Sequence, residues 1–135
     1  MDQMLSRYQP VVLSLFRFIT GLLLFQYGIA KLFKFPVLAY FANLPPLITT
    51  AGAIELVLGA LLMIGLWSRI VAFILSGEMA FAYFLGHVFK NPAEPVWLPL
   101  NNGGTAAILF CFACLYLSTA GGGPYSVDAT MGKKN

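Results

Sequence analysis

The chain has 135 residues, of which 59% are apolar and only 10% are charged. Soluble domains carry about 25% charged residues, so this composition indicates a membrane protein. The net charge of +3 is spread over both ends and the loops without a basic stripe, which argues against nucleic acid as a partner. The two cysteines are too few for a disulfide scaffold, and we expect a single domain over residues 1–135.

A membrane-spanning helix needs about 20 mainly apolar residues, and four segments are predicted to form one. No small-residue cleavage site closes the first apolar run, so we expect that helix to be retained. Proline-containing connectors follow the first and third segments, and a Gly/Pro-rich tail with a polar end follows the fourth. The predicted fold is therefore all-α, an antiparallel four-helix transmembrane bundle. The predicted helices are residues 11–33, 47–67, 70–89 and 103–119.

Four spans place both termini on one side of the membrane. Lys and Arg in short loops favour the cytoplasmic side, and the terminal side has a small excess of them. The sequence therefore predicts both termini in the cytoplasm. The terminal side carries Arg7, Arg69, Lys133 and Lys134, and the other side carries Lys31, Lys34 and Lys90.

Three charged residues lie deep in the predicted spans, where charge is costly and usually faces a partner. At about 1.5 Å per residue, Glu55 and Glu78 fall within a few ångströms of mid-membrane, and Arg17 about 7 Å to the cytoplasmic side. Two desolvated carboxyl groups do not readily both ionise. We expect Arg17 to pair with one of them while the other holds a proton, and these three residues form the predicted catalytic set. The alternative is a buried ion-pair cluster that only fixes the helix register.

The charges of the first two helices share helix faces with glycines. Small residues allow helices to approach closely in lipid, so these faces are predicted to form the bundle interior. The glycines are Gly21 and Gly28 beside Arg17 and Lys31, and Gly52 and Gly59 beside Glu55.

A second polar group is predicted on the outer side of the membrane. Lys31 and His87 lie roughly 13 Å and 10 Å outward of their helix centres, and Tyr83 precedes His87 by one helical turn. Asn102 and Thr105 open the fourth helix, whose N-terminus would suit an anionic or carbonyl-bearing ligand. These five residues form the predicted ligand-binding set, with plain capping and an interfacial histidine as the alternatives. A lone histidine gives no metal site.

Cys111 and Cys114 form a CxxC spacing in the middle of the fourth helix. A reactive CxxC usually lies at a helix N-terminus, where the helix dipole activates a thiol. We therefore interpret the two cysteines as small buried residues.

Five segments of the sequence, in this order and spacing, resemble the DoxX family of small four-helix membrane proteins. They cover nearly the whole chain, and Arg17, Lys31, Glu55 and Glu78 match polar positions of that family. Thr105 stands where similar proteins usually have a glutamate, so a site that uses that carboxylate is not carried over. The segments are RFITGLLLFQYGIAKL (17–32), AGAIELVLGALLMIGLWSR (51–69), GEMAFAYFLGH (77–87), NNGG (101–104) and GGGPYSVD (121–128).

The resemblance implies a link to redox chemistry. DoxX-like proteins are named for a subunit of an archaeal thiosulfate:quinone oxidoreductase, and relatives are linked to quinone or catechol handling, thiol-oxidative stress complexes and membrane-protein chaperoning. We therefore expect an accessory component of membrane redox or quinone metabolism, in the inner membrane of a bacterium. It would bind a quinone-like or other small carbonyl ligand.

The sequence has no flavin, haem or iron–sulfur motif, so any electron carrier would be the ligand or a partner protein. Oxidoreductase activity would then be that of a subunit of a quinone-linked complex. Two alternatives remain open beside this one. The first is a non-enzymatic membrane partner or assembly subunit, and the second is a small proton-coupled transporter. Four helices are few for alternating access, so a transporter would require a homo-oligomer in the lipid bilayer.

Overall fold

The computed structural model describes residues 1–35 and 45–132, and all regular structure in these ranges is helical. The predicted connector around 34–46 lies mostly outside the described residues, as do Lys133 and Lys134. Two short helices near the chain ends, α1 and α7, were not expected from the sequence. The elements are α1 (Asp2–Arg7), α2 (Gln9–Phe33), α3 (Pro46–Ile64), α4 (Ser68–Tyr83), the π-helix η2 (Phe84–Val88), α5 (Pro99–Asn102), α6 (Thr105–Ala120) and α7 (Val127–Thr130).

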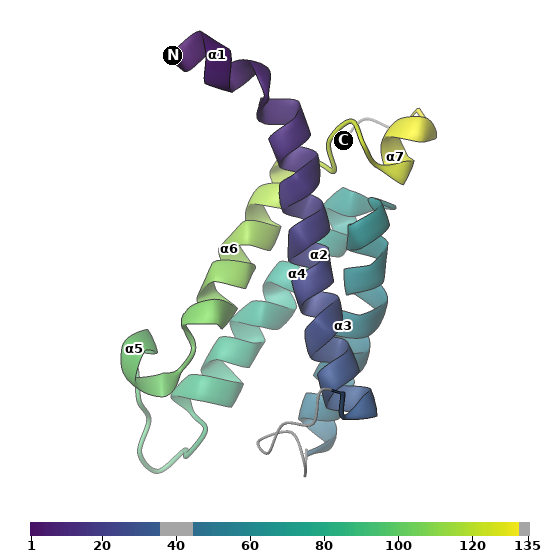
Figure 1. Cartoon of the computed structure of the whole chain (residues 1–135). Helices are drawn as coiled ribbons and strands as arrows, with labels where there is room; N and C mark the ends of the chain where they lie inside the picture. Colours follow the sequence, from purple (N-terminus) through teal and green to yellow (C-terminus); the bar gives the residue numbers. More distant parts are fainter. Residues whose placement is uncertain (36–44, 133–135) are drawn as a thin grey trace.

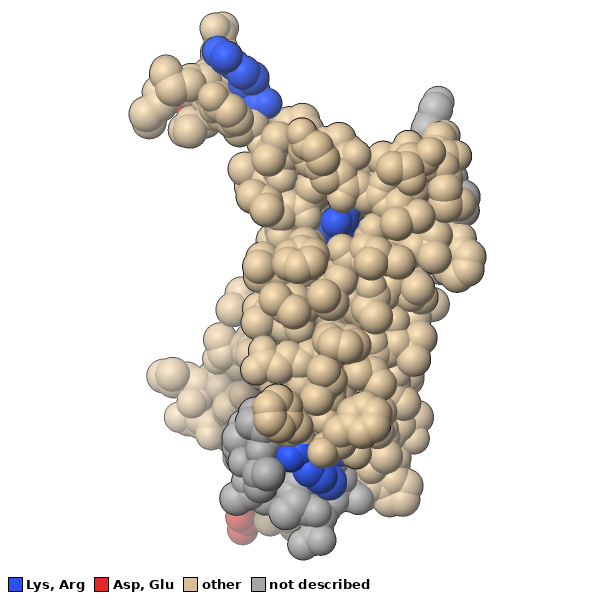
Figure 2. Space-filling model, turned by 45° about the vertical axis from the view of Figure 1, so that its right-hand side comes forward, with Lys and Arg blue, Asp and Glu red and all other residues tan. Residues whose placement is uncertain are grey.

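Three of these helices are long and apolar enough to cross a membrane: α2, α3, and α4 together with η2. Helix α6 is also apolar but has 16 residues, about 24 Å of helix against a hydrocarbon core about 30 Å thick. The prediction of an apolar helical bundle is confirmed, with the fourth helix shorter than a full span. Figure 2 shows an uncharged surface along the bundle, with Lys and Arg only toward the two ends of the face in view.

The helices form two closely packed pairs (Figure 1). Helix α2 packs on α3, and α4 packs on α6. The two pairs meet where α3 turns into α4, and Figure 1 shows them diverging toward the end that carries α5. Helices α1 and α7 lie at the opposite end. One wholly buried leucine from each long helix meets in the core: Leu24, Leu62, Leu75 and Leu117.

The close contact between α2 and α3 depends on glycines. A Cβ atom at Gly28 would lie 2.5 Å from the backbone nitrogen of Leu56, and one at Gly59 would lie 2.8 Å from that of Phe25. Such distances leave no room for a side chain. The prediction that the glycine faces form the bundle interior is confirmed, and these contacts set the register of α3 against α2.

Candidate functional site

Lys31 of α2 and Glu55 of α3 form a salt bridge inside the bundle. The Lys31 Nζ atom lies 2.8 Å from Glu55 Oε1 and 3.0 Å from Oε2. Glu55 is wholly buried, and the Lys31 side chain is 13% exposed. Gly52 makes room for the lysine, because a Cβ atom there would lie 2.8 Å from Lys31 Cβ. Both oxygens of Glu55 are thus bound by one cation.

Glu78 of α4 completes this group, which we call the intramembrane triad: Lys31, Glu55 and Glu78. Glu78 lies close enough to Glu55 and to Lys31 for their charges to act on it. The Oε1 atom of Glu78 is buried and has no hydrogen-bond partner among the described residues. The expected proximity of the two carboxylates is confirmed, whereas a catalytic role for them stays a prediction.

The expected pairing of Arg17 with these carboxylates is wrong. Its guanidinium group donates hydrogen bonds to three backbone carbonyl oxygens, those of Gly122, Met63 (3.2 Å) and Tyr125 (3.1 Å). The glycine contacts between α2 and α3 bring Lys31 level with Glu55, and they bring Arg17 level with the end of α3. Arg17 therefore extends toward the chain segment after α6, and Lys31 is the counter-charge within the bundle.

Residues 121–131, the C-terminal segment, fold back over the end of the bundle instead of leaving it as a polar tail. Asp128 is 3% exposed, and its carboxylate accepts hydrogen bonds from the backbone nitrogens of Trp67 and Ser68, both at 2.8 Å. These nitrogens belong to the N-terminus of α4, where a carboxylate is stabilising. The Ser14 hydroxyl of α2 accepts from the Tyr125 nitrogen at 3.1 Å. The C-terminal segment thereby joins α2 to the α3–α4 turn.

The structure brings together only part of the ligand-binding set predicted on the outer side of the membrane. Tyr83, His87 and Asn102 do come together: the Tyr83 hydroxyl accepts from Asn102 Nδ2 at 3.3 Å, and His87 Nδ1 lies 3.1 Å from the Asn102 carbonyl oxygen. Lys31 does not join them, because it is bound to Glu55, which corrects the expectation of an outer cluster around it. Thr105 is exposed and does not cap α6. Instead, Asn102 Oδ1 accepts from the Gly104 nitrogen at 2.8 Å.

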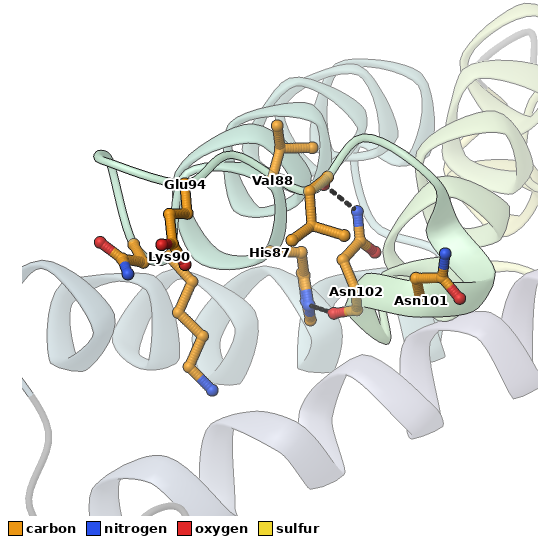
Figure 3. A pocket seen from close by; sticks show the side chains of 8 residues that line it. His87, Val88, Lys90, Glu94, Asn101 and Asn102 are labelled. Atoms are coloured by element: carbon orange, nitrogen blue, oxygen red, sulfur yellow. Dashed lines mark hydrogen bonds between the residues drawn. The ribbon is translucent and has the colours of Figure 1, made fainter.

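A shallow, open pocket of about 500 Å³ lies beside this outer group. In Figure 3, the His87 side chain points toward the backbone carbonyl oxygen of Asn102, and the Asn102 side-chain amide points away from it, donating to the Val96 carbonyl oxygen at 2.9 Å. The π-helix turn of η2 carries His87 to this position. No group of three or more His, Cys, Asp and Glu side chains within residues 1–35 and 45–132 could hold a metal ion. The pocket is lined by His87, Val88, Lys90, Asn91, Glu94, Val96, Asn101 and Asn102.

Two residues that matter here, Asp128 and Tyr27, are not recognisable from sequence patterns. Asp128 lies in GGGPYSVD, where the glycines and proline predict a helix breaker followed by a polar tail. Tyr27 carries no distinguishing signal in the sequence, and Lys31 Nζ lies 5.7 Å from the centre of its ring. The two cysteines are free: Cys114 is wholly buried and Cys111 partly so. Cys114 lies close enough to Glu78 for electrostatic interaction.

A helical bundle with an apolar exterior and charged residues paired in its interior defines an integral membrane protein with an intramembrane polar site. Comparison with known proteins agrees with that class. The DoxX family model matches residues 12–88, and the chain belongs to the DoxX family. It is also 36% identical to a Haemophilus influenzae protein described as uncharacterized, over 96% of this chain and 98% of that protein. No solved structure matches.

Proposed function

We propose that this DoxX protein is an accessory component of membrane redox or quinone metabolism that binds a small carbonyl-bearing ligand at the intramembrane triad. The single observation that carries the proposal is the buried Oε1 atom of Glu78, which has no partner among the described residues. A buried polar atom without a hydrogen bond costs about 1–3 kcal/mol. A quinone carbonyl or hydroquinone hydroxyl would supply the missing hydrogen bond.

The triad suits a ligand that gains and loses protons. Lys31 binds both carboxylate oxygens of Glu55, so the hydrogen-bonding capacity of Glu55 is already used within the protein. Glu78 is then the member that can hold and release a proton beside the ligand. Reduction of a quinone to a hydroquinone takes two electrons and two protons. The electrons would come from a redox partner protein, and Glu78 would pass on one of the protons.

The test is calorimetric titration of the purified protein in lipid nanodiscs with a short-chain ubiquinone. Glu78→Gln keeps the shape of the side chain but removes the transferable proton, and we expect at least a roughly tenfold weaker affinity, the equivalent of one good hydrogen bond. Glu94→Gln, in the outer pocket, is the matched control and should bind like the wild type. Equal affinities for Glu78→Gln and the wild type would refute the proposal, as would wild-type protein that binds no quinone.

We also place the protein in the bacterial inner membrane with both termini in the cytoplasm. Support comes from the excess of Lys and Arg on the terminal side and from α1 and α7, which lie at one end of the bundle (Figure 1). Periplasmic alkaline phosphatase fused after residue 135 should be inactive, and cytoplasmic green fluorescent protein at the same position should fluoresce. The reverse pattern would overturn this orientation.

A second candidate function is that of a non-enzymatic partner subunit. It is favoured by the Lys31–Glu55 salt bridge, which is complete without a ligand. A purely structural role in fixing the helix register would be sufficient to explain this ion pair. Under this reading, Glu78→Gln would leave quinone affinity unchanged, and the loss of the whole protein would lower the abundance of a membrane complex. Complex abundance restored equally by wild type and Glu78→Gln would favour this candidate over the first.

A further inference from the structure

The side of the bundle between α2 and α6 is the least tightly packed. The other three sides, α2–α3, α3–α4 and α4–α6, are closed by more extensive contact, whereas α2 touches α6 only sparsely. Figure 1 shows the two helix pairs diverging toward the α5 end, so this side widens in the half of the bundle that holds Lys31. We call it the α2–α6 seam. It faces the bilayer along its length.

Two aromatic pairs bridge the α2–α6 seam. Phe16 and Tyr116 lie toward the end that carries α1, with ring centroids 6.4 Å apart. Tyr27 and Phe110 lie further along, edge to face, with centroids 6.2 Å apart. Tyr27 is 38% exposed, and one helical turn separates it from Lys31 of the intramembrane triad. The second pair therefore lies on the exposed side of the bundle next to Lys31, whose Nζ atom is 5.7 Å from the centre of the Tyr27 ring.

Helix α6 also borders the triad from within. Phe110 packs against the central hydrophobic core, and Cys114, one turn further along α6, interacts with Glu78. A ligand that parts Tyr27 from Phe110 would meet Lys31 on one side and Glu78 on the other. Separation of one aromatic pair costs little free energy, since such a pair contributes only modestly beyond the area it buries.

From this arrangement we infer that the Tyr27–Phe110 pair is a lateral gate through which the ligand of the triad arrives from the bilayer. The ligand class is then a lipid-soluble, planar molecule with a polar carbonyl or hydroxyl group. Its ring passes between the two aromatic side chains, and its polar group reaches Glu78. The inference deepens the proposed function and rests on it for the identity of the ligand alone.

The route can be tested without that ligand, with dicyclohexylcarbodiimide dissolved in the lipid of a nanodisc. This probe adds to a protonated carboxyl group, and the adduct rearranges to a stable N-acylurea without any further reagent. We expect Glu78 to be labelled and the wholly buried, salt-bridged Glu55 to remain unlabelled, as measured by peptide mass spectrometry. A water-soluble carbodiimide should label Glu78 far more slowly.

Gate variants give the decisive comparison. In the Tyr27→Ala and Phe110→Ala variants, the lipid-soluble carbodiimide should label Glu78 about three- to tenfold faster than in the wild type. This factor corresponds to the loss of one aromatic pair. Phe16→Ala, in the other pair, is the matched control and should label at the wild-type rate. Where an alanine variant fails to fold, Tyr27→Leu replaces it. In a chain with both native cysteines changed to alanine, Tyr27→Cys and Phe110→Cys joined by a short bifunctional thiol reagent should suppress labelling.

The inference is overturned if Glu78 is labelled no faster in the gate variants than in Phe16→Ala. It is also overturned if Glu78 is labelled at the normal rate when residues 27 and 110 are cross-linked, or if Glu78 is not labelled at all. Faster labelling by the water-soluble reagent also overturns it and points to the outer pocket as the route. Failure of the proposed function is a separate outcome. In that outcome the gate variants change the labelling rate of Glu78 as expected, but the wild-type protein binds no quinone. In that case the gate stands and admits a different lipophilic molecule.

Discussion

The two buried cations of α2 are stabilised in different ways. Lys31 faces a carboxylate, whereas Arg17 is 3% exposed and is surrounded by backbone carbonyl oxygens, with Asp128 near enough to attract it electrostatically. Arginine suits such a place because its planar guanidinium presents five donors in a fixed arrangement, and carbonyl oxygens from separate segments accept three hydrogen bonds from it here. Lysine suits a single carboxylate partner.

Removal of the Lys31 charge should be strongly destabilising. Lys31→Met leaves Glu55 buried without its cation, and we expect a loss of about 3–5 kcal/mol in the free energy of unfolding. Thermal unfolding in detergent, followed by circular dichroism, measures the effect. The double variant Lys31→Met/Glu55→Met removes both charges and should recover much of the loss. Arg7→Met, at an exposed position of α1, is the control and should be neutral.

Asp128 should matter to stability through the two backbone nitrogens that it binds. Asp128→Ala leaves the start of α4 without this cap, and we expect a loss of about 1–2 kcal/mol. Hydrogen exchange should show faster exchange at Trp67 and Ser68 in particular. Asp2→Ala, which alters an exposed acidic residue of α1, is the comparison. Similar exchange at both nitrogens in Asp128→Ala and the wild type would contradict the capping role.

At the scale of the elements, glycines decide how closely α2 and α3 approach, and glycine position matters more than glycine content. Gly28 faces the backbone of α3, whereas Gly77 on α4 has no atom of the described structure within 4 Å of where its Cβ would lie. Both glycines lie within helices. The contrast separates the packing role of a helical glycine from its intrinsic effect on helix stability.

Gly28→Ala should push α2 from α3 and destabilise the protein by about 1–3 kcal/mol. It should also weaken the Lys31–Glu55 salt bridge, since α2 carries Lys31 one turn further along. Gly77→Ala is the matched variant, and it should be neutral or stabilising by up to about 1 kcal/mol. The thermal midpoints of the two variants measure the difference. Equal midpoints would contradict the close helix contact.

At the scale of the whole molecule, the C-terminal segment closes one end of the bundle, and the other end is where the helix pairs diverge. The closed end holds Arg17 and Asp128, each bound to backbone groups of distant segments. The intramembrane triad and the Tyr27–Phe110 pair lie toward the diverging end. Such an arrangement would let the helix pairs move near the proposed ligand site while their other ends stay joined.

Deletion of residues 121–135 should therefore destabilise the bundle more than the loss of a polar tail would. Two of the three carbonyl oxygens that accept from Arg17 would disappear and leave a buried charge poorly solvated. Arg17→Met removes that charge, and the deletion should be less harmful in that background. The fraction of monodisperse protein after size-exclusion chromatography measures each variant. Equal losses in both backgrounds would contradict the role of Arg17.

Much of the architecture followed from patterns along single helices. Apolar runs predicted the long helices to within a few residues, and the shared faces of Gly21, Gly28, Gly52 and Gly59 predicted which sides meet. The depths of Glu55 and Glu78 predicted that these two carboxylates lie together. Each of these properties depends on spacing within one helix or on the thickness of the membrane, and both are readable from the sequence.

The sequence by itself thus determined a membrane bundle with charges on its inner faces, because apolar length and helical periodicity are local properties. Only the tertiary structure decided which charge meets which partner. A shift of a few residues between α2 and α3 changes the partner of Lys31, and that shift depends on close backbone contacts such as the one between Gly28 and Leu56. The contact between the folded-back C-terminal segment and Arg17 likewise depends on long-range interactions, since its hydrogen bonds join residues more than a hundred positions apart.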